Sequence, residues 1–397
     1  MLKFEAKKMI PREQTMLRTA AFASLLVAIS AACSYSQVTV SRPMPPTVTV
    51  HVASSGTEHV PDTIFGSFLE PIGNSINNGI VAEILVNRSL EGGLWNHVNL
   101  ENMFRERPEL IESSNVNGLP MPWEPLNKSA GNRFELHVGD AANSWQSLEL
   151  MGLPTEEVGI MQKVYLPVHR VLSYKVSFYA KHVSGPSAML VEFRNAESGK
   201  VLTSAQLNTN AKEWTKYSAV LTLEAGQVRR LEAVDFGIGP VGNGRVDVDQ
   251  ISLLPTDAIG TLDPDAVAMS KAMHITELRF GGNFSSYYHW RDGIGPEDKR
   301  LTTENIAWGI PEYNNFGTDE FLQLCDLLGV IPQFNLNMGS GTPEEAAEWV
   351  QYIRAHHKGR VLYELGNELY GKWQTGYPTL GELADRTTAF SKAVRAV

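Results

Sequence analysis

The stretch Leu362-Tyr-Glu-Leu-Gly-Asn-Glu-Leu-Tyr370 decides how the rest of the chain is interpreted. The segment Val361–Leu365 is apolar and aromatic, which predicts a short buried strand that ends at Gly366. Asn367 and Glu368 then follow at the carboxyl end of that strand. A glutamic acid in an apolar rim can protonate a leaving oxygen, and an asparagine beside it can bind a hydroxyl next to the reacting carbon. The same Gly-Asn-Glu sequence also occurs in ordinary turns. Other parts of the sequence are therefore needed to decide whether this motif is catalytic or only a turn.

The composition is that of a soluble globular protein, since 43% of the 397 residues are hydrophobic and 20% are charged. The length allows two domains or one large barrel with an insert. The net charge of −10 argues against nucleic acid and anionic membranes as partners. The two cysteines provide no disulfide framework, and Cys325 shares a predicted helical face with apolar neighbours, so we expect a buried thiol.

Residues 1–36 have the form of a signal peptide followed by the start of a linker. Basic residues precede an apolar run, Ala20 to Ala32, that is too short to span a bilayer comfortably. Ala31-Ala32-Cys33 resembles a bacterial lipoprotein cleavage site, but Ser30 stands where a larger aliphatic residue is usual. Ordinary signal cleavage is therefore the favoured alternative to lipidation at Cys33. In either case we predict an exported protein, which would be periplasmic, extracellular or on the outer surface.

Strands and helices alternate on both sides of a long middle segment. Residues 37–95 contain the predicted strands Val48–Val52 and Ile64–Glu70, and the predicted helix Ile80–Val86. In residues 257–397 we predict helices at 264–273, 319–328 (capped by Thr318), 342–356 and 379–397, and strands at 275–280, 331–337 and 361–365. These elements make four strand–helix units, whereas a (β/α)8 TIM barrel needs eight. We therefore expect the first four units of such a barrel, truncated after the fourth.

The middle segment, residues 96–256, is a series of short alternating stretches without a good helix, such as Lys175–Ala180 and Arg245–Leu253. Regular strand spacing with turn signals between the strands predicts an inserted β-sandwich of the carbohydrate-binding-module type. Its aromatic residues Trp145, Tyr165 and Trp214 can stack on sugar rings or belong to the sandwich core.

A long loop follows the predicted strand Ile275–Phe280. It contains the aromatic and charged run Tyr287–Asp292 and continues through Trp308, Glu312 and Asn315 to Gly317. Rings for stacking and fixed polar groups suit a carbohydrate site, although a packed loop accounts for several of these residues. Neither His289 nor the pair His356-His357 has metal-ligand spacing, so we predict no metal and no cofactor.

Four motifs in this order resemble glycoside hydrolase family 51, the retaining α-L-arabinofuranosidases. Together they cover most of residues 60–95 and 262–385. The combination is specific, although each piece alone is not. The motifs are Phe65-Gly-Ser-Phe-Leu-Glu70, Leu278-Arg-Phe-Gly-Gly-Asn-Phe284 continued by Tyr288–Pro296, Asn315-Phe-Gly-Thr-Asp-Glu-Phe321, and Gly366-Asn-Glu368 with Gly371-Lys-Trp-Gln374. The sequence departs from the family by lacking the proline that is usual between Phe280 and Gly281.

The resemblance implies a hydrolase that releases terminal α-L-arabinofuranosyl groups from arabinose-containing plant polysaccharides. Glu368 would be the general acid/base, and Asn367 would bind the hydroxyl adjacent to the anomeric carbon. Glu70, Arg279 and Asn283 match positions that shape the arabinose subsite, and Trp308 is a further predicted substrate-binding residue. Retaining chemistry needs two carboxyl groups about 5 Å apart. In the family the nucleophile comes from a strand that would lie beyond Val397, so we expect this chain alone to be inactive.

Two other readings remain open. The chain could be a carbohydrate-binding protein in which the partial barrel is catalytically dead. It could also belong to a related barrel enzyme that cleaves xylosidic or glucan linkages with the same Asn-Glu pair.

Overall fold

The computed structural model of the protein describes residues 60–131 and 133–397. The predicted signal peptide, the linker and the strand Val48–Val52 lie outside these residues. Within the described part of the chain, no helix is both long enough and apolar enough to cross a membrane.

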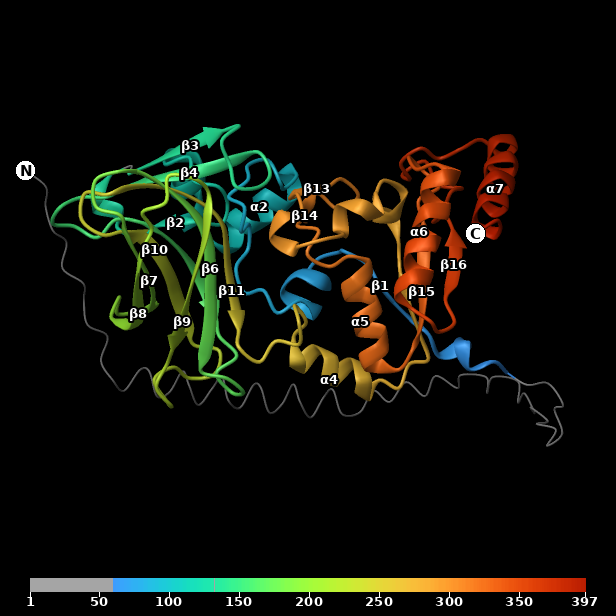
Figure 1. Cartoon of the computed structure of the whole chain (residues 1–397), viewed down its shortest axis with the longest axis horizontal. Helices are drawn as coiled ribbons and strands as arrows, with labels where there is room; N and C mark the ends of the chain where they lie inside the picture. The colour runs from blue at the N-terminus through green and yellow to red at the C-terminus, as the bar shows by residue number, and fades with distance from the viewer. Residues whose placement is uncertain (1–59, 132) are drawn as a thin grey trace, which may run out of the picture. The chain divides into compact units, whose positions relative to one another are not determined.

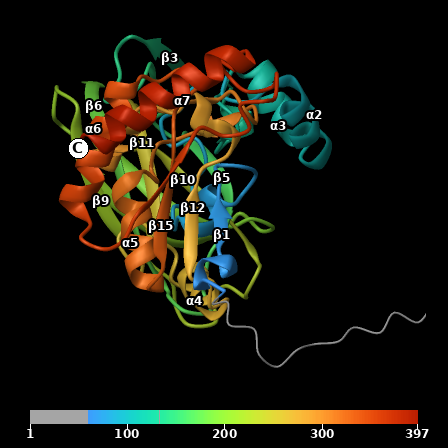
Figure 2. The ribbon, with the colours of Figure 1, turned by 90° about the vertical axis from the view of Figure 1, so that its right-hand side faces the viewer.

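A four-stranded, all-parallel sheet forms the α/β part of the protein, with its strands in the order β1-β12-β15-β16. Figure 2 shows the first three side by side. Parallel strands need crossover connections, and the helices between these strands provide them. The strands are β1 (Ser67–Leu69), β12 (Glu277–Phe280), β15 (Ile331–Leu336) and β16 (Leu362–Leu365).

The helices of the α/β part lie where the sequence predicts them. The residues that cap their amino-terminal ends explain where most of them begin. Asp263 and Thr342 cap helices that begin with proline, and Thr379 forms a full capping box with Glu382. One cap prediction is wrong: Gly317, not Thr318, is the N-cap of α5, and the Thr318 hydroxyl accepts from the Trp349 indole instead. The helices are α4 (Pro264–Ala272), α5 (Thr318–Leu328), α6 (Pro343–His356) and α7 (Leu380–Arg395).

The face of the parallel sheet that is covered by helices holds the core of the α/β part. Phe280 is 1% exposed, and its ring lies 5.1 to 6.0 Å from those of four other aromatic residues. Burial of one such ring contributes about 2–3 kcal/mol to folding. Cys325 belongs to the same cluster, which confirms the predicted buried thiol. The opposite face of the sheet carries polar residues instead, including Arg279, Gln333, Asn335 and Glu364.

Two five-stranded antiparallel sheets, made of strands β2 to β11, form the β part (Figure 1). Aliphatic and aromatic side chains alternate inward from both sheets into a common core that includes Phe178, Phe193 and Phe236. One sheet has the order β2 (Glu124–Pro125), β5 (Ile160–Tyr165), β10 (Ala233–Pro240), β7 (Ala188–Asn195), β8 (Val201–Asn208), and the other β3 (Phe134–Val138), β4 (Gln146–Met151), β11 (Arg245–Pro255), β6 (Ser173–Ser184), β9 (Thr215–Thr222).

Two sequence predictions near the start of the β part are wrong. The predicted helix Ile80–Val86 is absent: a single π-helical turn, η2 (Ile76–Ile80), is followed by a non-helical stretch that sends Leu85 and Leu90 into the sandwich core. The segment 96–123 is not helix-free, because α2 (His97–Glu106) begins at the N-cap Asn96 and α3 (Glu109–Ile111) follows. Leu100, Met103 and Phe104 form an apolar stripe on α2, but all three are only half-buried.

The long loop after β12 contains short elements of secondary structure. Three 3₁₀ turns, η5 (Asn283–Ser286), η6 (Trp290–Gly293) and η7 (Glu297–Lys299), precede a two-stranded hairpin of β13 (Thr303–Asn305) and β14 (Ile310–Glu312).

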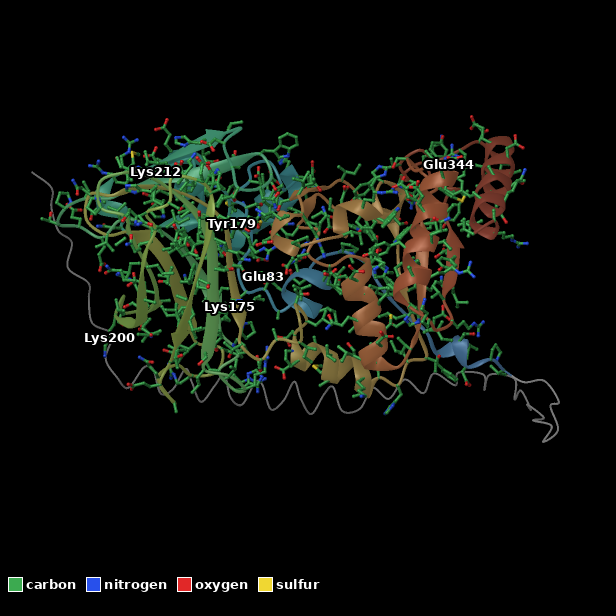
Figure 3. The ribbon with its side chains drawn as sticks, in the orientation of Figure 1. Glu83, Lys175, Tyr179, Lys200, Lys212 and Glu344 are labelled. Atoms are coloured by element: carbon green, nitrogen blue, oxygen red, sulfur yellow. The ribbon has the colours of Figure 1, made fainter. Side chains whose placement is uncertain are left out.

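Buried polar contacts join the α/β part to the sandwich. Glu83, labelled in Figure 3, accepts hydrogen bonds from the Leu253 amide and the Ser252 hydroxyl of β11. Arg88 bridges Glu83 to Glu297 of the long loop, at 3.3 and 2.7 Å. The segment 83–88 therefore ties the loop that follows β12 to the sandwich.

Candidate active site

Three predicted site residues meet in one hydrogen-bonded chain at the carboxyl ends of β12 and β16. The Arg279 guanidinium donates to the Asn367 amide oxygen at 2.8 Å, and the Asn367 amide nitrogen donates to the Asn283 side-chain oxygen at 3.1 Å. Arg279 also pairs with Glu364 through its Nε atom. Because both ends of its amide are held by fixed partners, Asn367 is confined to one orientation.

The loop after β16 supports this chain from the other side. Gln374 donates to the Asn283 oxygen at 2.6 Å and accepts from the Ser286 hydroxyl at 2.6 Å. Gln374 is 4% exposed, so these bonds are shielded from water and hold the loop firmly against η5.

Glu70 is a further predicted site residue that the fold buries and holds by hydrogen bonds. It follows β1, is 8% exposed, and accepts hydrogen bonds from the Trp308 indole at 3.0 Å and, more weakly, from the Phe284 amide at 3.4 Å. Gly282 makes this position possible, because a Cβ there would lie 2.1 Å from the Glu70 carboxyl carbon. Gly282 also has a φ of +133°, a conformation that residues with a Cβ rarely adopt. The structure thus brings Glu70 and Trp308 together.

Trp308 is positioned by the segment that sequence analysis had placed in the helix-free insert. The Asn99 side chain of α2 donates to the carbonyls of Trp308 and Gly309 at 2.9 and 2.8 Å, and the Asn96 amide donates to the Gly309 carbonyl at 2.9 Å. Helix α2 lies beside the β13–β14 hairpin in Figure 1. Sequence analysis missed Asn96 and Asn99; the one available signal was an asparagine that could cap a helix at residue 96.

Glu368 follows Asn367 in a strained backbone conformation and points outward. Its φ of +44° lies in the left-handed region, which is uncommon for a residue other than glycine and often marks a functional position. Tyr370 and Trp373 donate to its two carboxylate oxygens at 3.1 and 3.2 Å. Glu368, Tyr370 and Trp373 are all exposed, so the apolar, water-shielded rim expected from the sequence is not formed by these residues.

Most of the aromatic run after η5 belongs to the core rather than to a sugar-binding surface. Tyr288 and Trp290 are each 6% exposed and pack with Trp349 of α6. His289 and Arg291 point to the same helix and pair with Glu345 and Glu348. The packed-loop alternative is therefore correct for these four residues.

Glu312 is a buried carboxyl group that sequence analysis did not single out as unusual. It is 8% exposed; one oxygen accepts from the Asn314 amide at 3.0 Å, and the other has no hydrogen-bond partner. Burial raises the pKa of Glu312 to about 7, far above its usual range. The hydroxyls of Tyr287 and Tyr288 are also buried without partners, and burial, followed by the charge of Glu312, raises the pKa of each.

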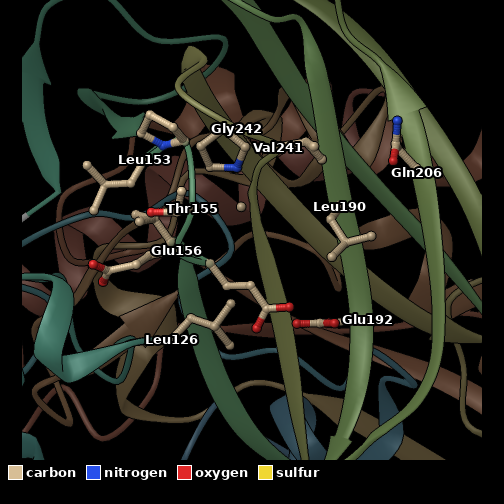
Figure 4. A pocket seen from close by; sticks show the side chains of 14 residues that line it. Leu126, Leu153, Thr155, Glu156, Leu190, Glu192, Gln206, Val241 and Gly242 are labelled. Carbon is tan, nitrogen blue, oxygen red and sulfur yellow. The ribbon is translucent and has the colours of Figure 1, made fainter.

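The three aromatic residues singled out in the sandwich lie at its surface. Trp145 and Tyr165 are 66% and 60% exposed, so the core alternative is wrong for both. Trp214 is half-buried and donates to Asp140 at 3.1 Å. None of the three lines the cavity of about 310 Å3 shown in Figure 4, whose walls include Leu153, Thr155, Leu190, Glu192 and Gln206. Tyr165 lines a different and larger cavity, of about 580 Å3.

Comparisons with known proteins agree with the motifs. Residues 269–386 match the family model described as the α-L-arabinofuranosidase 1 domain. The chain is 38% identical over 148 residues to the probable α-L-arabinofuranosidase C of Aspergillus fumigatus. This match covers 33% of this chain and 29% of that protein. It is 43% identical over 109 residues to the intracellular exo-α-L-arabinofuranosidase of Bacteroides ovatus, covering 27% of this chain and 20% of that protein.

A solved structure, that of the arabinose-bound MgGH51 α-L-arabinofuranosidase, resembles most of the chain. The TM-score is 0.65 at 19% identity, over 86% of this chain and 58% of that one, which shows a shared fold. This chain thus spans less than two thirds of the length of each of these relatives. The resemblance to the family 51 α-L-arabinofuranosidases is therefore confirmed, over part of their length.

Proposed function

We propose that the chain carries the general acid/base and the arabinose subsite of a retaining α-L-arabinofuranosidase. Glu368 is the acid/base, and Glu70, Trp308, Arg279, Asn283 and Asn367 form the subsite. The substrates are terminal α-L-arabinofuranosyl groups of arabinan or arabinoxylan. The observation that carries the proposal is the Arg279–Asn367–Asn283 chain at the carboxyl ends of parallel strands, whose middle residue directly precedes Glu368.

Hydrogen bonds support the tasks proposed for Asn367 and Glu368. The Asn367 amide has two hydrogens; one goes to Asn283, so the other is free to donate to a sugar hydroxyl. Tyr370 and Trp373 orient the Glu368 carboxyl through its two oxygens. As an acid it protonates the leaving oxygen, and as a base it then takes a proton from the attacking water.

The proposal includes parts that lie beyond these residues. The four parallel strands are one side of a closed (β/α)8 barrel, and the other strands supply the nucleophile about 5 Å from Glu368. The order of the four strands and the 58% coverage of the solved relative support this arrangement. We further propose that the protein is exported, as its amino-terminal sequence predicts.

For the sandwich we propose sugar binding, which is supported by the exposed rings of Trp145 and Tyr165. Affinity electrophoresis on arabinoxylan tests this idea, and Trp145→Ala together with Tyr165→Ala should abolish the retardation. Retardation that the double variant retains would contradict a role for these rings.

The assignment of Glu368 is tested with leaving groups of different quality in the complete protein. Glu368→Ala should lose at least about 100-fold more activity on arabinoxylan than on an activated aryl arabinofuranoside, because a nitrophenolate leaves without a proton. Asn367→Ala should slow both substrates alike, since its contact does not depend on the leaving group. Glu344→Ala, at an exposed position in the first turn of α6, is the matched control and should leave both rates unchanged. An equal loss on both substrates for Glu368→Ala would overturn its role as the acid.

A further inference from the structure

A row of carboxylates crosses the outer face of the sandwich. Glu135 of β3 lies opposite Glu149 of β4, which in turn lies opposite Asp247 of β11. Like charges directly opposite one another destabilise an antiparallel pair. Glu149 and Asp247 are each only 2% exposed, so water does little to screen them. This arrangement needs positive charge close by.

Two permanent cations meet only part of that need. Lys181 pairs with Asp247 Oδ2 at 3.1 Å and with Asp140, and Arg245 pairs with Glu149 Oε1. With Asp140 the cluster holds four carboxylates, against the two cations. The net charge of the cluster is therefore about −2 when His137 is neutral. Each cation engages one oxygen of a buried carboxylate and leaves the other oxygen free.

The free oxygens face His137. Its Nε2 atom lies 3.4 Å from Glu149 Oε2, and its Nδ1 atom lies 3.3 Å from Asp247 Oδ1. Asp247 Oδ1 is buried and has no hydrogen-bond partner. Glu135, His137 and Glu149 each offer one ligand atom, and these atoms lie within 4.8 Å of one another. Two donors bound at about 2.05 Å to a tetrahedral ion lie about 3.3 Å apart, close to the separation of His137 Nε2 and Glu149 Oε2.

We propose that this cluster is a binding site for a divalent transition-metal ion of the Zn2+ type. His137 Nε2, Glu149 Oε2 and a Glu135 oxygen are the ligands. Asp247 Oδ1 accepts a hydrogen bond from the Nδ1–H group of His137, the usual way in which a carboxylate orients a metal-binding histidine. The imidazole ligand selects zinc over calcium or magnesium, which prefer all-oxygen sites. The ion offsets the net charge of the cluster and clips the edge strand β3 onto β4 and β11.

The site is independent of the proposed glycosidase chemistry, because all of its residues belong to the sandwich. Its sequence signal is weak: only Glu135 and His137 are close in the chain, on the same face of β3. The other residues come from β4 and β11 and meet them only through strand pairing.

The test is a calorimetric titration of the purified chain, without a histidine tag and after treatment with a chelator, using Zn2+ alone. We expect saturable binding of one ion per chain and a rise of about 4 °C or more in the thermal midpoint. Mg2+ and Ca2+ should give neither. His137→Ala should abolish binding, Glu135→Gln should weaken it at least about tenfold, and Asp247→Asn should weaken it by about 10- to 100-fold.

His97→Ala is the matched control, since exposed His97 has a single carboxylate neighbour, Glu101, and its loss should leave Zn2+ binding unchanged. Glu135 is exposed, so Glu135→Gln keeps the test valid even if His137→Ala does not fold. The proposal is overturned if the wild-type chain binds no Zn2+ with one-to-one saturation. It is also overturned if Glu135→Gln and His137→Ala bind Zn2+ as the wild-type chain does, because the ion would then bind elsewhere.

Discussion

The parallel sheet and the sandwich each have a buried apolar core, but their polar residues lie in different places. In the sandwich, two sheets share one apolar core, and the charges lie on the outer faces. In the α/β part, helices cover one face of the sheet, and the other face carries Arg279, Gln333, Asn335 and Glu364. Such a row of polar residues weakens a core, so its presence on one sheet face indicates a function there. The candidate site lies at the end of this polar face.

The largest expected effect is the loss of stability caused by a substitution in either core. Phe280→Ala in the α/β part and Phe236→Ala in the sandwich should each cost about 3–5 kcal/mol, because both rings are at most 1% exposed. Urea denaturation followed by limited proteolysis shows which part each variant destabilises. We expect each substitution to release only its own part. If either variant unfolds both parts in a single step, the buried junction around Arg88 makes them one cooperative unit.

The second effect concerns the pH dependence of stability in the α/β part. The pKa of Glu312 is raised to about 7 by burial, so between pH 4.5 and 7 the folded chain holds a proton that the unfolded chain has lost. Stability from this group is therefore fully present below pH 4.5 and falls as the pH rises through 7, by up to about 3 kcal/mol. The group acts within a cluster that includes Tyr287 and Tyr288.

Glu312→Gln should remove this dependence, so that the variant gains stability relative to wild type as the pH is raised from 5 to 8. Thermal unfolding across that range measures the difference. Glu304→Gln, at an exposed position on the paired strand β13, is the control and should follow the wild-type curve. Parallel curves for wild type and Glu312→Gln would contradict the assignment.

The smallest effect concerns the packing around Glu70. Gly282→Ala places a Cβ against the Glu70 carboxylate, whereas Gly295→Ala adds one in open space; both glycines have positive φ. Both variants suffer backbone strain, but only Gly282→Ala adds a clash with the Glu70 carboxylate, so we expect it to cost about 1–2 kcal/mol more. In the complete protein it should also raise KM. Equal stabilities would mean that the Glu70 side chain has room to move.

Local signals predicted the α/β part well. The capping residues Thr342 and Thr379 and the apolar faces behind them are encoded within a few residues, so the helix positions followed from the sequence. The run Ile80–Val86 shows the limit, because its apolar residues suit either a helix or an extended segment. Packing of Leu85 and Leu90 into the sandwich decided in favour of the extended form.

The candidate site was predicted through its motifs, and the contacts between them needed the structure. Arg279, Asn283 and Asn367 were named from the sequence, and they do meet. Asn96 and Asn99 support Trp308 although they lie about 200 residues away in the sequence. Glu312 is buried only because the folded loop covers it. No local pattern carries that information.

The most direct test of the central claim is azide rescue of Glu368→Ala in the complete protein with an activated aryl arabinofuranoside. Without its base the variant should accumulate glycosyl-enzyme, and azide, which needs no deprotonation, should restore turnover. The account predicts an azido arabinose that keeps the anomeric configuration of the substrate, whereas Glu344→Ala should release free arabinose. No rescue, or an azido sugar of inverted configuration, would contradict Glu368 as the acid/base of a retaining enzyme.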